Sequence, residues 1–155
     1  AQNELDAHEV WVRSEAREDG TYPTVTKRFL TVQCMHCTNP PCVNVCPTAA
    51  NYVRADGLVL INEKRCIGCK YCVVACPYQA RVFNEERGTP GKCKLCQTRI
   101  EKGVQPACVL ACPAGARYFG DLGDPGSPIA RLVVSRKAVR LRDDLGTQPN
   151  IYYVR

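Results

Sequence analysis

Twelve cysteines are the residues of this chain whose type and spacing could do chemistry. The chain has 155 residues, and an ordinary soluble domain of that length has few cysteines. All twelve lie between Cys34 and Cys112, where they form three groups of four. Cysteines at this density indicate disulfides, zinc sites or iron–sulfur clusters. The spacing within each group separates these three kinds of site.

The second group has the spacing of a bacterial ferredoxin motif, CxxCxxCxxxCP. Its residues are Cys66, Cys69, Cys72, Cys76 and Pro77. The first group ends in the same way but has a longer spacer between its second and third cysteines. Its residues are Cys34, Cys37, Cys42, Cys46 and Pro47. Both groups therefore predict ligands of [4Fe–4S] clusters.

The spacing also predicts which cysteines share a cluster. Three thiolates on one tight loop can bind three corners of an iron–sulfur cube, while a turn of helix carries the fourth cysteine away. That fourth cysteine ligates the cluster of the neighbouring motif. We therefore expect two interlocked clusters. Their ligands are Cys34, Cys37, Cys42 and Cys76 for the first, and Cys66, Cys69, Cys72 and Cys46 for the second.

The third group has the same Cys-Pro ending but a long insert between its second and third cysteines. Its residues are Cys93, Cys96, Cys108 and Cys112. If the fourth cysteine of a motif ligates the cluster of a neighbouring motif, Cys93, Cys96 and Cys108 lack a fourth ligand and Cys112 belongs to another cluster. The sequence contains no partner for this group. Either all four cysteines bind one cluster, or a partner motif is missing from the sequence.

The segments around the cysteines predict an α+β fold, a ferredoxin-like polyferredoxin with duplicated cluster-binding motifs and cysteine-free flanks. The three Cys-Pro endings, each followed by small residues, form an internal repeat. We expect strands over 57–61, 80–83 and 116–119, and helical turns over 43–45 and 73–75. In the tail, Ser127 and Pro128 predict the start of a helix that ends near Arg136, and 138–141 predict a strand.

Charge and hydropathy favour neither nucleic-acid binding nor a membrane-spanning helix. The formal net charge is +6, but a [4Fe–4S]²⁺ core with four thiolates carries about −2, so three clusters would bring the loaded protein near neutrality. The basic balance is therefore not evidence for nucleic-acid binding. No apolar run approaches the roughly 20 residues that a membrane-spanning helix needs. Any membrane association must come through a partner.

Other kinds of site fit the cysteines less well. Zinc ribbons use two separated cysteine pairs, and zinc chemistry does not require the proline that ends each group. Disulfides within CxxCxxC spacing would be strained. Catalysis at an open iron would need a missing ligand, whereas the first two groups are complete. His36 lies inside the first group, and we expect it to contact the cluster's surroundings or the surface rather than iron.

The motifs resemble those of a known family of electron-transfer subunits. The motifs are Cys34-Met35-His36-Cys37 with Pro40-Pro41-Cys42, Cys66-Ile67-Gly68-Cys69 with Cys76-Pro77-Tyr78 and Ala80-Arg81, Lys92-Cys93 with Cys96 and Arg99, Gly103 with Pro106-Ala107-Cys108, and Phe119-Gly120-Asp121-Leu122. In this order they resemble the iron–sulfur subunit of the molybdopterin oxidoreductases, of the dimethyl sulfoxide reductase and polysulfide reductase type. The resemblance covers nearly the whole chain.

The resemblance implies a non-catalytic chain that relays single electrons through [4Fe–4S] clusters. Its implied partners are a molybdopterin subunit, with molybdenum or tungsten, and a membrane-anchor subunit that exchanges electrons with quinone. The complex would be membrane-associated through these partners, and the polysulfide reductase relatives favour the periplasmic side. A free, diffusible polyferredoxin and a zinc-stabilised interaction module are the alternatives. The three cysteine groups give three clusters on this chain.

The resemblance also implies a fourth cluster. Family members carry another CxxCxxCxxxC motif before the first one seen here, followed by residues like Asn3-Glu4 and Trp11-Val12-Arg13. We therefore expect the sequence to start just after such a motif, which would complete the cluster of Cys93, Cys96 and Cys108 and leave Cys112 to the fourth.

Four parts of the chain follow from this interpretation. They are an N-terminal flank over 1–33, a two-cluster ferredoxin-like module over 34–92, a third cluster motif over 93–122, and a docking tail over 123–155. We expect the apolar end of that tail, Ile151-Tyr152-Tyr153, to dock on a partner, because free apolar ends are a liability.

Overall fold

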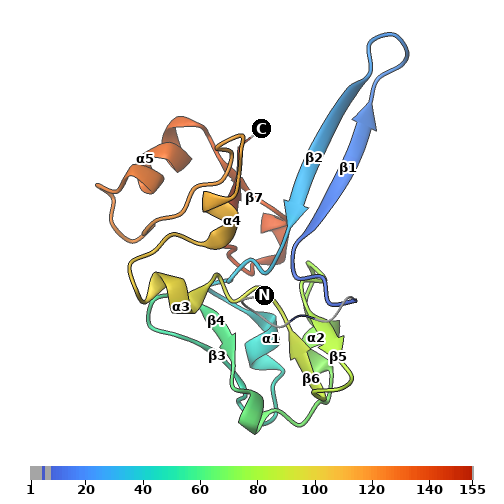
Figure 1. Ribbon diagram of the computed structural model, residues 1–155, viewed down its shortest axis with the longest axis vertical. Coiled ribbons are helices and arrows are strands. Elements are labelled where there is room, and N and C mark those ends of the chain that lie inside the picture. The colour runs from blue at the N-terminus through green and yellow to red at the C-terminus, as the bar shows by residue number, and fades with distance from the viewer. Residues whose placement is uncertain (1–4, 6–7, 155) are drawn as a thin grey trace.

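Short helices and two-stranded antiparallel hairpins make up the chain, with no larger sheet among the described residues. The structure is a computed structural model that describes residue 5 and residues 8–154. Asn3 and Glu4, which entered the resemblance, lie outside the described residues. The hairpin of β1 (Arg13–Asp19) and β2 (Thr26–Val32) projects away from the hairpins of β3 (Asn51–Val53) with β4 (Val59–Ile61) and of β5 (Val82–Asn84) with β6 (Thr89–Gly91), which belong to the first two cysteine motifs (Figure 1). The α+β class predicted from the sequence fits this arrangement.

The first two motifs are built alike. The first contains α1 (Pro41–Asn44), β3 (Asn51–Val53) and β4 (Val59–Ile61), and η1 (Glu63–Arg65) leads to the second, with α2 (Tyr71–Val74), β5 (Val82–Asn84) and β6 (Thr89–Gly91). Each one-turn helix is thus followed by a hairpin. The two helices contact each other, and Cys42, Val59 and Cys72 form a buried cluster between the motifs.

The helical turns begin two residues earlier than the sequence predicts. Pro41 occupies the first turn of α1, where its missing N–H costs no hydrogen bond. The predicted strand over 57–61 is shortened to β4, because Gly57 lies in a turn with a φ of 82°. The predicted strand over 80–83 starts two residues later, at Val82. The positions of these elements along the chain are as predicted, and their ends are not.

The third motif has no hairpin. It contains α3 (Gln97–Ile100) and α4 (Ala107–Leu110). The strand predicted over 116–119 is wrong, since no strand forms at these described residues. Gly115 turns the chain with a φ of 58°, and the backbone N–H of Ala116 then donates to the Cys112 Sγ at 3.3 Å instead of to a neighbouring strand.

The tail begins with the predicted helix. α5 (Pro128–Ser135) is capped by Ser127, whose Oγ accepts from the backbone N–H of Ala130 at 3.1 Å. It is followed by β7 (Val139–Arg140), η2 (Asp143–Leu145) and β8 (Tyr152–Tyr153). The predicted strand at 138–141 is present as β7, and it pairs with β8.

The end of the tail packs on the first cysteine motif. The Asn150 N–H donates to the carbonyl of Met35 at 2.9 Å, and the Tyr153 hydroxyl donates to the carbonyl of Thr31 at 2.8 Å. Ile151 and Tyr153 also pack against the core beneath that motif. The chain itself therefore covers these two residues in part. A docking role for 123–155 stays a prediction.

A long hairpin before the first motif was not predicted. β1 (Arg13–Asp19) and β2 (Thr26–Val32) pair in register along their whole length, and most of their residues are exposed. Arg13 anchors the base of this hairpin to the second motif by donating to the carbonyls of Tyr78 and Gln79, both at 2.9 Å. None of the helices in the described part of the chain has the length and apolar character needed to cross a bilayer.

Candidate metal centre

Three of the four cysteines predicted for the first cluster lie around one buried core. Cys34 and Cys37 are part of this core, and Cys76, which follows α2 of the second motif, packs against it. Cys42, on α1, is also buried. Burial, together with the neighbouring Cys34, Cys42 and Cys76 thiolates, raises the pKa of the Cys37 thiol to about 11, although Thr147 opposes this. The four thiols are thus close enough to repel one another when ionised.

The cysteines predicted for the second cluster line one pocket. Cys66, Cys69 and Cys72 come from the second motif, and Cys46 comes from the end of the first. The backbone N–H of Asn51 donates to the Cys46 Sγ at 3.5 Å. Burial raises the pKa of this thiol, but hydrogen bonds from Asn51 and Thr48 outweigh it and lower the pKa to about 7. Cys46, the fourth cysteine of the first motif, therefore lies with the first three of the second, and Cys76 packs on the core that contains Cys34 and Cys37.

The third group is in contact with the first. Cys93 packs against the core that contains Cys34. Burial raises the pKa of the Cys93 thiol to about 11, the Leu95 N–H opposes this, and the nearby Cys34 and Cys108 thiolates add to it. The pKa of Cys112 is instead lowered, first by the hydrogen bond from Ala116. The ligand assignment for Cys93, Cys96, Cys108 and Cys112 stays a prediction.

His36 offers a test of whether a cluster fits the first site. Its ring is buried, with 3% of the residue exposed, and its Nδ1 accepts from the backbone N–H of Val59 at 3.1 Å. Its Nε2 therefore carries the proton, and it has no hydrogen-bond partner within the described residues. A buried donor without an acceptor is costly. A cluster on the adjacent Cys34 and Cys37 would supply sulfur acceptors, so the site fits one.

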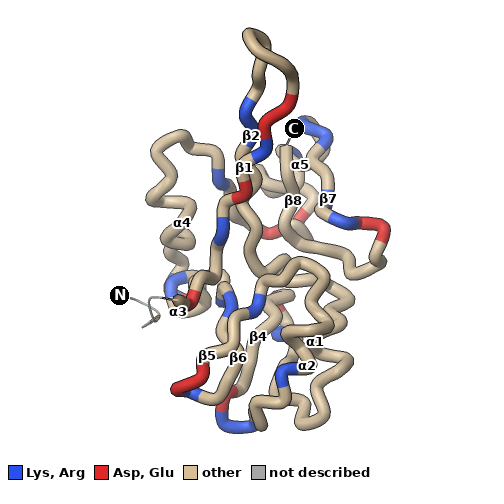
Figure 2. The backbone as a smooth tube through the Cα atoms, turned by 90° about the vertical axis from the view of Figure 1, so that its right-hand side faces the viewer, with Lys and Arg blue, Asp and Glu red and all other residues tan. Residues whose placement is uncertain are grey.

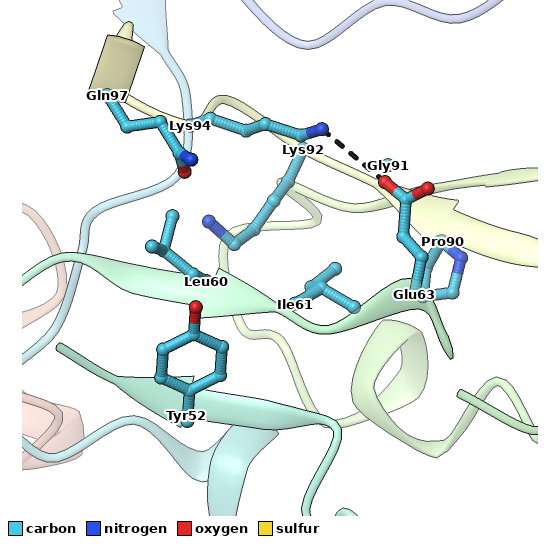
Figure 3. Close-up of a pocket in the computed structure, with 9 residues that line it drawn as sticks. All are labelled: Tyr52, Leu60, Ile61, Glu63, Pro90, Gly91, Lys92, Lys94 and Gln97. Carbon is cyan, nitrogen blue, oxygen red and sulfur yellow. Dashed lines mark hydrogen bonds and ion pairs between the residues drawn. The ribbon is translucent and has the colours of Figure 1, made fainter. Parts of the chain in front are cut away.

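Two buried cations lie beside the cysteines. Arg81, which directly precedes β5, is 5% exposed, and its Nη2 donates to the Cys42 Sγ at 2.9 Å. Lys92, directly after β6, is 1% exposed, and its Nζ donates to the carbonyls of Val59 and Cys93. Figure 3 shows Lys92 extending towards β4, whereas Lys94 turns to Glu63.

The buried cations change the chemistry of the thiols. Burial alone would raise the pKa of Cys34, but the charge of Lys92 is the largest of the influences that lower it well below its usual value. Burial raises the pKa of Cys42, and Arg81 opposes that rise. The sequence pointed to Arg81 and Lys92 only as parts of the resembling motifs and assigned them no role. The feature of the sequence that could have indicated a role for them is a charged residue within an otherwise apolar or cysteine-rich segment.

The cysteines are all available as ligands. All twelve lie in the described part of the chain, and all are free thiols. A disulfide framework is therefore not what the cysteines build. Across residues 5 and 8–154, no three Cys, His, Asp or Glu side chains are arranged to hold a single metal ion. A zinc site needs every ligand about 2.0–2.3 Å from one ion. An iron–sulfur cube does not need four cysteines around a single ion, because each cysteine binds a separate iron of the cube.

Comparisons with known proteins identify the kind of site. The model of a family described as a 4Fe-4S dicluster domain matches residues 25–122, the segment that holds all twelve cysteines. The B component of the polysulfide reductase of Wolinella succinogenes is 43% identical to this chain, over 94% of the chain and 76% of that protein.

Two further relatives carry similar descriptions. The B component of the selenate reductase of Mesobacillus selenatarsenatis is 39% identical, over 88% of this chain and 58% of that protein. The B component of the tetrathionate reductase of Salmonella typhimurium is 48% identical, over 84% of this chain and 53% of that protein. The chain thus spans between about half and three quarters of the length of these relatives.

Proposed function

This chain is a member of the 4Fe-4S dicluster family of iron–sulfur subunits, and from that premise we propose that it relays single electrons between two partner subunits. The proposed donor and acceptor are a molybdopterin catalytic subunit and a quinone-reactive membrane subunit. The chain itself is a non-catalytic electron-transfer subunit, in keeping with its similarity to the corresponding components of several reductases. The proposed complex is membrane-associated through its partners and faces the periplasm.

We propose the following ligand sets. Cys34, Cys37, Cys42 and Cys76 hold the first cluster, and Cys66, Cys69, Cys72 and Cys46 hold the second. Cys93, Cys96 and Cys108 hold a third, completed by Cys112 or by a cysteine of a preceding motif. The observation that carries the proposal is the exchange, in which Cys46 lines a pocket with the second motif and Cys76 packs with the first.

When bound, the clusters supply the one-electron redox chemistry. The chain's own residues hold the thiolates in place and keep water away from the first site. Met35 and Tyr78 are among the most buried residues in the core beneath it. Val59, which is 1% exposed, packs with Cys42 and Cys72, the cysteines on the two helices. Water exclusion and hydrogen bonds to sulfur are the means by which a protein sets a cluster's potential.

The experiment is an anaerobic purification of the protein from its native membranes. We expect a brown protein with about four iron and four acid-labile sulfide per cluster. Reduction should give electron paramagnetic resonance signals from more than one cluster. A large molybdopterin subunit should co-purify. A preparation that contains zinc and no iron would overturn the proposal. Elution of the loaded protein alone, at its own mass, would support the free carrier instead.

A further inference from the structure

The first cysteine motif brings no formal charge of its own. Residues 32–53 contain no Lys, Arg, Asp or Glu, and the chain around α1 is correspondingly tan in Figure 2. Any fixed charge beside the first site must therefore come from another segment. Arg81 is one such charge, because the chain after the second motif returns it to the first site.

Arg81 connects the two cysteine sets. Its Nη2 donates to the Sγ of Cys42, at the first site, at 2.9 Å. Its Nη1 donates to the Oδ1 of Asn51 at 2.7 Å, and the backbone N–H of Asn51 donates to the Sγ of Cys46 at 3.5 Å. Asn51 also lines the pocket of the second set. A continuous series of hydrogen bonds thus runs from Cys42 through Arg81 and Asn51 to Cys46.

Arg81 has no carboxylate partner within the described residues. A buried charge without a counter-charge is strongly destabilising. The groups that can balance Arg81 are the thiolates, since Cys42 contacts it and the Cys72 and Cys34 thiolates also stabilise its charged form. A cluster with four thiolates, at about −2, is the counter-charge that this position lacks.

We infer that Arg81 raises the reduction potential of the cluster held by Cys34, Cys37, Cys42 and Cys76, and that Asn51 extends this influence to the neighbouring cluster. This inference rests on the proposed function. Reduction adds one negative charge to the cluster, and a buried cation in contact with a ligand sulfur stabilises the added charge. Arg81 is a positioning and tuning residue here, and it does not ligate iron.

Three variants separate charge from packing. Arg81→Gln removes the charge, and we expect it to shift the reduction equilibrium of the first cluster at least tenfold towards the oxidised form, which is about 59 mV for one electron. Arg81→Lys keeps the charge and should stay close to the wild type. Asn51→Asp leaves Arg81 in place but neutralises it, so both clusters should become harder to reduce. Arg17→Gln, on the exposed hairpin with a side chain 83% exposed, is the matched control and should change neither.

The measurement is a potentiometric titration of the loaded protein, followed by electron paramagnetic resonance. The signal that Cys42→Ser alters identifies the first cluster. Iron and sulfide are measured for every variant, so that a wild-type protein without clusters counts against the proposed function alone. If Arg81→Gln fails to load, Asn51→Asp decides the inference.

Equal shifts in Arg81→Gln and Arg81→Lys would overturn the inference, because they would indicate packing rather than charge. An unchanged potential in a loaded Asn51→Asp protein would overturn it as well. A larger shift of the first cluster than of the second in Arg81→Gln supports it.

Discussion

The first two cysteine motifs and the third share a Cys-Pro ending but are built differently. In the first two, each one-turn helix is followed by a hairpin, and the helices α1 and α2 contact each other. The third has α3 and α4 without a hairpin, and its Cys112 is held by the N–H of Ala116. The difference teaches that two motifs of like build bring cysteines of one beside cysteines of the other, while the fourth ligand of the third group stays a prediction.

The largest expected effect comes from substituting a cysteine that is proposed to ligate the cluster of the other motif. Cys76→Ser should remove the same cluster signal as Cys34→Ser, although Cys76 belongs to the second motif, and Cys66→Ser should remove the other. Iron and acid-labile sulfide should fall by about four atoms each per protein molecule, as measured by colorimetric analysis and electron paramagnetic resonance.

The control for this prediction is Cys112→Ser, in the third motif. It should leave both of the first two signals in place. A Cys76→Ser protein that matches Cys66→Ser instead would mean that each motif keeps its own fourth cysteine.

A smaller effect separates the loops of the second and third motifs. Gly68 and Gly115 both have positive φ, at 70° and 58°. A Cβ at Gly68 would lie 2.7 Å from the carbonyl oxygen of Gly88, whereas at Gly115 it would meet no atom within 4 Å. We expect Gly68→Ala to lower the free energy of unfolding by about 3 kcal/mol, from strain and overpacking together.

Gly115→Ala carries the strain of the positive φ alone, so its cost should be about 1 kcal/mol. Anaerobic urea unfolding of the two loaded variants measures the difference. Equal midpoints would show that the second loop is no more tightly packed than the third.

The smallest effect compares two tyrosines that follow the Cys-Pro endings. Tyr78 is 4% exposed, and its hydroxyl bonds to the buried Thr147 Oγ1 at 2.5 Å, while Tyr118 is 62% exposed. Tyr78→Phe should cost about 1–2 kcal/mol because it removes a buried hydrogen bond. Tyr118→Phe should change the unfolding free energy by less than about 0.5 kcal/mol in the same urea assay.

The sequence was most informative where a function depends on local spacing. Cysteine spacing placed Cys46 beside the second motif, where it lines a pocket with Cys66, Cys69 and Cys72. Ser127 with Pro128 predicted the start of α5, because capping is decided by neighbouring residues. The strand at 116–119 was mispredicted, since a β-like run forms a strand only when another segment pairs with it. Whether such a segment is present is not a local property.

Long-range contacts were out of reach of the sequence. Arg81 meets Cys42 across 39 positions, and Asn150 donates to the carbonyl of His36 across 114 positions. Helix and strand periodicities relate residues only a few positions apart, so they could not predict either contact. The hairpin β1–β2 was missed for another reason. Its strands are mostly exposed and highly charged, so they lack the alternation of polar and apolar residues by which a strand is recognised.

The most direct test of the exchange is an anomalous difference map, recorded at the iron absorption edge from crystals of the loaded protein. We predict that the cube bound by Cys34, Cys37 and Cys42 takes its fourth thiolate from Cys76, and that the cube bound by Cys66, Cys69 and Cys72 takes its fourth from Cys46. A map in which Cys76 binds the same cube as Cys66 would contradict the account.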